Sequence, residues 1–463
     1  MKKIFTLSVM LILCMLTFAT DFMRIKFKNY GCIEKYEVDI IEEVNLEGST
    51  TAIDLMRIKL KDGNIKIHEM SIIEKVEFEI GEDTSSIGDT TSTDSSVLPL
   101  AFSITSDSTA EVSSFHTCHQ HQNLDSISIP AEIQIEGKKY NVTSIGASAF
   151  YKCPGLTSIN IPEGVTSIGS SAFKGCGSLK SINIPKSVTS IESSAFGGCS
   201  NLTSISIPEG VTSIGTSAFF NCRSLTSISI PEGVTSIAHY AFWGCSGLTS
   251  ISIPEGVTSI GSSAFRECSS LTSINIPEGV TSIGSSAFYK CGSLTSINIP
   301  EGVTSIGASA FYECGSLTSI YIPESVTFIG AEAFMVCSSL TSISIPEGVT
   351  SIGASTFENC GSLKSISIPE GVTSIGASTF ENCGSLKSIS IPEGLTNIGE
   401  DAFTFCRSLK SIDIPESVTS IGNYAFSGCS NLDVTIDNSE DNVEVGRYTF
   451  LGCKSATWLK EKD

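Results

Sequence analysis

The stretch LTSISIPEGVTSIGTSAFFNCRS, from Leu202 to Ser224, decides the fold because close copies of it follow one another along the chain. Its cysteine recurs every 23 residues from Cys153 to Cys429, its proline from Pro162 to Pro415 and its phenylalanine from Phe150 to Phe426. A fixed period of this length is typical of a solenoid, in which each repeat forms one coil that packs on its neighbours. The repeats predict one elongated body of about 13 coils with a long exposed surface.

Within one coil, the spacing of the apolar residues predicts two short strands and a turn. The segment Leu202–Ile207 has the pattern LxxIxI, which places both isoleucines on one face of a strand. The segment Ile207–Gly210 fits a type I turn with proline second and glycine fourth. Val211 and Ile214 then point back into the coil, and Ser217–Phe219 begins a helical turn capped by a serine or threonine. The predicted fold class is therefore α/β and rich in β-structure.

The sequences on either side of the repeats divide the chain further. Two lysines followed by a short apolar segment and small residues are typical of a cleaved signal peptide. Two copies of a pattern that begins MRIK, at Met23 and Met56, each predict a β-hairpin. The predicted parts are a signal peptide at 1–20, a small β-rich module with an internal duplication at 21–80, a flexible linker at 81–98, an N-terminal cap at 99–145, repeats at 146–432 and a C-terminal cap at 433–463.

The two caps are expected because the open ends of a solenoid core must be shielded from water. In the N-terminal cap, two hairpins are expected, one across Ser106–Ser108 and one across Glu136–Gly137. In the C-terminal cap, the cysteine spacing stretches between Cys429 and Cys453, and Trp458 has the size to cover the last coil.

The charge balance excludes two classes of partner. The chain has 28 Lys and Arg against 49 Asp and Glu, with a formal net charge of −21. Nucleic acids and anionic membranes require a basic surface, so neither is an expected partner. No second long apolar stretch follows the signal peptide, so no transmembrane segment is expected after its removal. The mature protein is expected to be exported and to lie at the cell surface, in association with the outer membrane, or in the medium.

The repeat LTSISIPEGVTSIGxxAFxxC resembles the BspA-like leucine-rich repeats, a 23-residue class found in surface proteins of bacteria and of some protists. The resemblance is close over about residues 150–430 and weaker over the caps. It implies a right-handed leucine-rich-repeat solenoid. It also implies a role in adhesion, through binding of host extracellular-matrix proteins, coaggregation or attachment to cells.

The residue after each repeat phenylalanine is the most informative variable position. In six successive coils it is aromatic, arginine or methionine, and these residue types are enriched at the centres of protein interfaces. The alternative is that these side chains partly pack against the neighbouring turns. Tyr240, Tyr321 and Phe328 fall in the same stretch but are expected on other faces. The candidate binding residues are Phe220, Trp243, Arg266, Tyr289, Tyr312, Tyr321 and Met335.

Three other sets of residues have simpler interpretations. The repeated cysteines are expected to be small buried apolar residues, because Cβ vectors that run parallel in a stack suit disulfides badly. The glutamates that follow the prolines are expected to form a solvated edge, although a row of carboxylates also suits Ca²⁺ or a basic partner. His116, Cys118 and His121 are weak candidate metal ligands, but their spacing matches no zinc motif and favours a polar loop.

These observations predict an exported, non-catalytic repeat protein that binds other macromolecules, as a bacterial adhesin for host matrix or cell-surface proteins. Two alternatives stay open, a spacer that displays the N-terminal module and a glycan-binding surface protein. Catalysis is not expected, because the chain has five histidines, no distinctive nucleophile and no glycine-rich phosphate loop. No cofactor is expected either.

Overall fold

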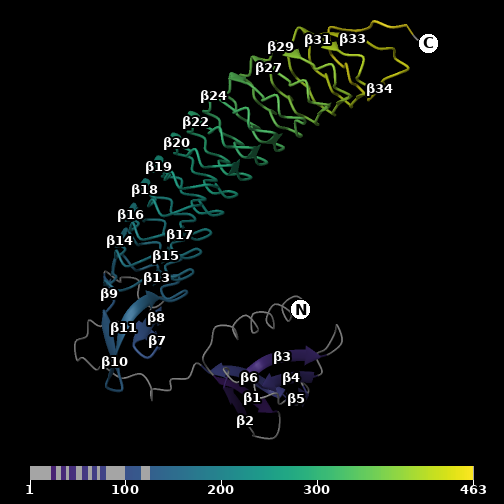
Figure 1. Cartoon of the computed structure of the whole chain (residues 1–463). Helices are drawn as coiled ribbons and strands as arrows, with labels where there is room; N and C mark the ends of the chain where they lie inside the picture. The colour runs from purple at the N-terminus through teal and green to yellow at the C-terminus, as the bar shows by residue number, and fades with distance from the viewer. Residues whose placement is uncertain are drawn as a thin grey trace. The chain divides into compact units, whose positions relative to one another are not determined.

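A computed structural model describes residues 22–27, 33–37, 41–47, 55–60, 65–69, 73–79, 100–115 and 126–461. The predicted signal peptide, the predicted linker and the weak metal candidates His116, Cys118 and His121 lie outside the described residues. The chain divides into two units, Met1–Thr91 and Ser92–Asp463 (Figure 1).

The described residues of the first unit form six strands in two antiparallel sheets. One sheet has the order β2-β1-β6 and the other the order β3-β4-β5. Because β1 pairs with β2 and β4 pairs with β5, each copy of the duplicated pattern forms an antiparallel pair. The boundaries of this module remain a prediction. The strands are β1 (Phe22–Phe27), β2 (Ile33–Glu37), β3 (Ile41–Glu47), β4 (Leu55–Leu60), β5 (Ile65–Glu69) and β6 (Ile73–Glu79).

The second unit opens with the two hairpins that the sequence predicts. The first joins β7 (Leu100–Ile104) to β8 (Thr109–Phe115), and the second joins β10 (Glu132–Ile135) to β11 (Lys138–Ile145). In the second hairpin, Glu136 and Gly137 have φ angles of 50° and 81°, as a two-residue turn with both residues left-handed requires. Because β8 pairs in parallel with β11, the hairpins lead directly into the stacked coils.

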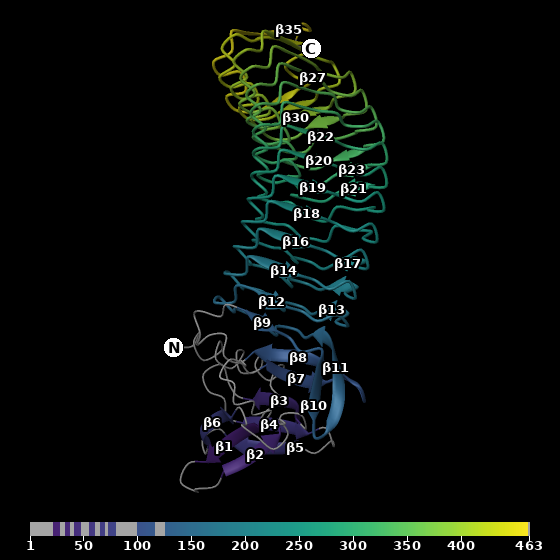
Figure 2. The same cartoon turned by 90° about the vertical axis from the view of Figure 1, so that its left-hand side faces the viewer.

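The coils that follow stack into a curved rod, with two rows of short parallel strands along it (Figures 1 and 2). The first strand row holds the LxxIxI segments, and most strands pair in parallel with their equivalent in the next coil, as Ser181 pairs with Ser204; the pairing is interrupted between β19 and β20 and between β29 and β31. Its strands are β9 (Ile127–Ser128), β12 (Ile159–Asn160), β14 (Ser181–Asn183), β16 (Ser204–Ser206), β18 (Ser227–Ser229), β19 (Ser250–Ser252), β20 (Ser273–Asn275), β22 (Ser296–Asn298), β24 (Ser319–Ile320), β26 (Ser342–Ile343), β27 (Ser365–Ser367), β29 (Ser388–Ser390), β31 (Ser411–Ile414), β33 (Asp433–Ile436) and β35 (Ser455–Trp458).

The second strand row begins at β11 and holds the segments after the proline turn. In three coils a single bridge at Ile237, Ile260 or Ile352 takes the place of a strand. The solenoid predicted from the repeat is thus present, with about 14 coils. The remaining strands of the row are β13 (Ser167–Ile168), β15 (Ser190–Ile191), β17 (Ser213–Ile214), β21 (Ser282–Ile283), β23 (Ser305–Ile306), β25 (Phe328–Ile329), β28 (Ser374–Ile375), β30 (Asn397–Ile398), β32 (Ser420–Ile421) and β34 (Glu444–Val445).

The core is one continuous column of repeated side chains. Phenylalanine rings of neighbouring coils stack face to face, as Phe219 does on Phe242 with ring centres 5.5 Å apart and planes 4° from parallel. Stacking and the parallel strands together supply the inter-coil contacts that one coil lacks. Most coils bury the same eight positions, although Ile389 and Ile391 are only partly buried; in coil 202–224 these positions are Leu202, Ile205, Ile207, Val211, Ile214, Ala218, Phe219 and Cys222.

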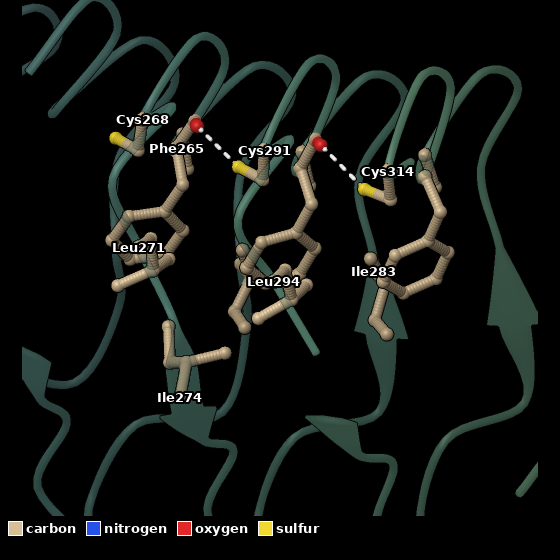
Figure 3. Packing of buried hydrophobic residues seen from close by; sticks show 14 of the residues in the cluster. Phe265, Cys268, Leu271, Ile274, Ile283, Cys291, Leu294 and Cys314 are labelled. Carbon is tan, nitrogen blue, oxygen red and sulfur yellow. Dashed lines mark hydrogen bonds between the residues drawn. The ribbon is translucent and has the colours of Figure 1, made fainter. Parts of the chain in front are cut away.

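The cysteines lie in this core as expected. The thiol of Cys291 donates a hydrogen bond to the carbonyl oxygen of Phe265 in the preceding coil, and the thiol of Cys314 donates to that of Phe288 (Figure 3). The cysteines from Cys176 to Cys453 are free thiols, while Cys153 is disulfide-bonded. A disulfide ladder along the stack is therefore excluded.

The helical turn predicted at Ser217–Phe219 is wrong. Ser217 and Asn221 have left-handed φ angles of 58° and 55°. The N–H of Ala218 donates within the coil to Gly215, but the N–H of Phe219 donates to Ala241 in the next coil. In a helix these N–H groups would donate to carbonyl groups of the same coil. Here every second N–H group donates to a carbonyl group of the next coil instead. None of the described residues is helical, and this third side of each coil, the turn segment, is a series of tight turns.

The proline turn is shifted by one residue from its predicted position. The N–H of Val211 donates to the carbonyl oxygen of Pro208 at 3.0 Å, so the turn runs from Pro208 to Val211 with glycine third. Serine can replace this glycine, because the hydroxyl of Ser187 then donates to the carbonyl oxygen of Val165 in the preceding coil at 2.7 Å.

Candidate binding surfaces

The residues after the repeat phenylalanines form one continuous row on the turn segments. Phe220 and Trp243 meet edge to face with ring centres 5.1 Å apart, and Tyr289 and Tyr312 stack with ring centres 4.5 Å apart. Arg266 lies between the two pairs. All five side chains are half-buried. We call this set, Phe220, Trp243, Arg266, Tyr289 and Tyr312, the aromatic row.

Arg266 links the two aromatic pairs. Its guanidinium carbon lies 3.8 Å from the ring centre of Tyr289 and 5.3 Å from that of Trp243. Its Nε atom is buried 3.4 Å from Oε1 of Glu267 without forming a hydrogen bond. Cation–π contacts of this kind are stronger where water is excluded, so Arg266 both orders its neighbours and adds a positive charge to the row.

The tyrosine pair presents its edges to solvent. The rings of Tyr289 and Tyr312 are within 4° of parallel, so each uses one face on the other, while Arg266 covers the second face of Tyr289. Burial, followed by the nearby Tyr289 and Glu313, raises the pKa of Tyr312. The Tyr312 hydroxyl therefore keeps its proton at physiological pH, and the carboxylate of Glu313 accepts a hydrogen bond from it.

Tyr240 joins the aromatic row, contrary to the expectation that it would lie on another face. Its ring centre lies 5.6 Å from that of Trp243, and its side chain is exposed. Tyr321 and Phe328 do lie elsewhere, since Tyr321 bridges to Asn298 beside the first strand row and Phe328 is in β25. Met335 occupies the next position of the same column and is half-buried.

The coil that contains Trp243 departs from the repeat at four positions close together. It reads IAHYAFW where coil 260–266 reads IGSSAFR. At the equivalent glycine of the next coil, Gly261, an added Cβ atom would lie 2.7 Å from the backbone nitrogen of His239, so this position lies close to the preceding coil. The second strand row is interrupted here, between Ile214 and Ile237, and Nδ1 of His239 accepts a hydrogen bond from the N–H of Ser262. A second interruption, before Ile352, has no such replacement to explain it.

The exposed side of the first strand row is built from small polar side chains. Most coils carry a threonine just before the strand, and its hydroxyl donates to the carbonyl oxygen of the same position in the preceding coil, as Thr249 does to Thr226 at 3.2 Å. Because these hydroxyls bond within the stack, they stabilise it and leave few distinctive groups for recognition. Tyr321 is an exception, and its hydroxyl donates to Oε1 of Glu301.

Most of the buried thiols have a raised pKa; Cys429, whose pKa is lowered by a hydrogen bond with Cys406, is an exception. Burial raises the pKa of Cys245 and Cys291 to about 12. Thiolates are the form that attacks electrophiles and binds metals, so these cysteines are inert near neutral pH. Within the part of the chain that the structure describes, no three side chains of His, Cys, Asp or Glu come together as a metal site.

Sequence reasoning missed a set of exposed apolar side chains near the C-terminus. Tyr424 and Tyr448 stack with ring centres 5.3 Å apart, and the guanidinium of Arg407 lies over Phe405. The sequence signals this set at one repeat position, where tyrosine replaces the serine that has a left-handed backbone conformation in other coils. The exposed members of this set are Phe405, Tyr424, Tyr448, Leu451 and Leu459.

Stacked coils with LxxIxI strands and a polar exposed surface define a leucine-rich-repeat solenoid. The sequence model of the BspA type Leucine rich repeat region matches the chain in six copies, over residues 113–249, 235–364 and 327–457. The chain belongs to this family. Leucine-rich-repeat proteins typically bind proteins and are generally not catalytic.

Two solved structures are similar to this chain. A leucine-rich repeat protein from Bacteroides ovatus ATCC 8483 is 32% identical, with 79% of this chain and 100% of that chain covered and a TM-score of 0.70. The pneumococcal vaccine antigen PcpA is 20% identical, with 88% of this chain and 99% of that chain covered and a TM-score of 0.51, which shows a shared fold. No functionally curated protein matches the chain. None of the described residues belongs to a helix with the length and apolarity of a membrane span.

Proposed function

We propose that this protein is an exported, non-catalytic adhesin that binds a host matrix or cell-surface protein through its aromatic row. The observation that carries the proposal is the arrangement of Trp243, Arg266 and Tyr289, in which the guanidinium lies between the two rings. Trp, Tyr and Arg are the residues most enriched among those that dominate binding energy at protein interfaces. Five coils bring them into one row about 20 Å long, which is long enough to form the centre of an interface.

The row is not needed to build the coils. In the coils on either side the same position is Lys174, Gly197, Glu358 or Glu381, and those coils still stack with a buried phenylalanine and cysteine. The departures Ala238 to Tyr240 lie where the second strand row is interrupted, beside the row. Natural proteins depart from the sequence preferences of their fold mainly at functional sites, so these departures support a functional role for this coil.

The geometry favours a protein partner over a glycan at this row. Sugars stack on free aromatic faces, but Tyr289 and Tyr312 cover each other and Arg266 lies over Tyr289. The ring edges and the guanidinium of Arg266, which is ion-paired with Glu267, remain accessible, and these suit the mixed apolar and polar surface of a protein. The spacer alternative does not require a row of this composition, and export follows from the predicted signal peptide.

The test is binding of the full chain to immobilised fibronectin, fibrinogen and collagen, compared with a Trp243→Ser, Tyr289→Ser, Tyr312→Ser variant. Saturable binding to one of them is expected, with a loss of about 100-fold in the variant, since two or three central residues usually dominate an interface. The matched control changes Glu358 and Glu381 to Ser in the same column, and it should bind like the unchanged chain.

Each result has a defined meaning. Equal binding by both variants would place the site elsewhere and contradict the role of the aromatic row. Absence of binding to all matrix proteins and to cultured epithelial cells, with the coil stack intact by circular dichroism, would support the spacer alternative.

A further inference from the structure

Three lysines occupy one column beside the first strand row in three consecutive coils. Lys364, Lys387 and Lys410 are exposed and immediately precede β27, β29 and β31. The N–H of Lys387 donates to the carbonyl oxygen of Lys364, so their backbones lie against each other. Coils in a parallel stack are about 4.8 Å apart, which places the three ammonium groups in a short line.

The fold gives no reason for these lysines. In seven preceding coils the column holds threonine, from Thr203 to Thr341, and the hydroxyl of Thr341 donates to the carbonyl oxygen of Thr318 at 3.2 Å. A lysine cannot make that short hydrogen bond, and three like charges in a line repel one another. Each replacement therefore removes a contact that stabilises the stack, which points to a role outside the fold.

Among the residues that the structure describes, no acidic side chain forms an ion pair with these three lysines. The ion pairs among the described residues engage other lysines, such as Lys290 with Glu313 and Lys454 with Asp433, and none of these three. The nearest acidic residues are at the Lys410 end of the line: Asp413 is three residues after Lys410, and Asp433, whose N–H donates to the carbonyl oxygen of Lys410, is paired with Lys454. No acidic residue stands within three positions of Lys364 or Lys387 in the sequence. A local positive line therefore persists on a chain whose net charge is −21.

We propose that Lys364, Lys387 and Lys410 form a binding track for an anionic polysaccharide, with carboxylate or sulfate groups along its length. One sugar unit of an extended chain is about as long as one coil is wide, so successive anionic sugars can meet successive lysines. Exposed hydroxyls of Ser365, Ser388 and Ser411 lie beside the lysines and can bond to sugar hydroxyls. In an extended acidic peptide, side chains on one face recur at about 6.7 Å, which does not match the coils.

The chain supplies a matched control for this track. Lys180 stands in the same column but alone, since the next seven coils hold threonine. Because threonine is the native residue of those coils, Lys→Thr changes in this column are expected to leave the stack folded. The lysine track is also separate from the aromatic row, so the two sites can be tested independently.

The experiment titrates the full chain with polygalacturonate, which carries carboxylates, and with heparin, which carries sulfates as well. Dextran serves as the neutral control and polyglutamate as the acidic peptide. The Lys364→Thr, Lys387→Thr, Lys410→Thr variant should lose about tenfold or more in affinity for the anionic polysaccharides, while Lys180→Thr stays within about twofold of the unchanged chain. The variant of the aromatic row should bind them normally.

Three results would overturn the proposal. The unchanged chain could fail to bind either anionic polysaccharide, or the triple variant could keep full affinity. Binding of polyglutamate as tight as that of polygalacturonate would show that the track selects acidic peptides instead. Binding of heparin alone would keep the proposal and assign the ligand to the sulfated class.

Discussion

The thiol of Cys291 donates a hydrogen bond to the carbonyl oxygen of Phe265, with 3.2 Å between sulfur and oxygen. The same carbonyl oxygen accepts the N–H of Cys268 within its own coil. The cysteine column thus joins each coil to the one before it, in addition to filling the core. Because the thiols are buried in this column, the stability of the stack should depend on pH in the range where they ionise.

Alkaline pH is expected to destabilise the stack through the buried thiols. The pKa of Cys291 is raised from 9.0 to about 12 by burial, so the folded chain holds the proton more tightly than the unfolded chain. The resulting stability is fully present below pH 9 and is lost as pH rises towards 12. Each such thiol should lower the free energy of unfolding by about 1.4 kcal/mol per pH unit across this window.

Urea unfolding of the unchanged chain and of Cys291→Ala at several alkaline pH values measures this effect. Near neutral pH, the unchanged chain should be more stable than Cys291→Ala. Above pH 9.5, the difference between their free energies of unfolding should shrink by about 1.4 kcal/mol per pH unit. Other titrating groups are common to both proteins and cancel. A difference that stays constant with pH would contradict the account of the buried thiol.

In most coils, though not at Glu192 or Ala238, a glycine follows the second strand and lies close to the backbone of the preceding coil. A Cβ atom on Gly284 would lie 2.6 Å from the backbone nitrogen of Ser262 in the preceding coil, whereas one on Gly292 would meet nothing within 4 Å. Gly284→Ala should destabilise the chain by about 1–3 kcal/mol, while Gly292→Ala should change it by less than about 0.5 kcal/mol. Thermal or urea unfolding of the two variants checks this, and equal effects would be inconsistent with the packing described.

The residue before each cysteine adopts a left-handed conformation that suits some side chains better than others. Val336 and Asn359 hold this position in adjacent coils with φ angles of 61° and 60°. Left-handed conformations are costly for β-branched residues and tolerated by asparagine. Val336→Asn should therefore stabilise the chain by about 1 kcal/mol, and Asn359→Val should destabilise it by a similar amount. Unfolding shifts in the same direction for both changes would refute this explanation.

The repeat predicted the strands and core of each coil but not the turn segment. Ala218, Phe219 and Cys222 have a spacing that fits one face of a helix, and the same spacing fits a series of tight turns. The difference lies in the N–H of Phe219, which donates to Ala241 in the next coil. A sequence read one coil at a time cannot show that neighbouring coils compete for these hydrogen bonds.

The aromatic row was predicted as a column, but its contacts were not. Because every coil repeats the same geometry, the residues after each phenylalanine had to lie side by side. Tyr240 was missed because it lies three residues before Trp243, and the left-handed φ of 58° at Tyr240 redirects its side chain towards the row. Which ring faces are covered, and so which partner is favoured, depends on side-chain angles that spacing does not determine.

The most direct test of the central claim uses Trp243 as a local probe. The chain has two tryptophans, so Trp458→Phe leaves the fluorescence of Trp243 alone to report on the aromatic row. Addition of a matrix protein that the chain binds should protect Trp243 from acrylamide quenching and shift its emission to shorter wavelength. Binding that leaves both the quenching and the emission of Trp243 unchanged would contradict the claim that the aromatic row is the binding site.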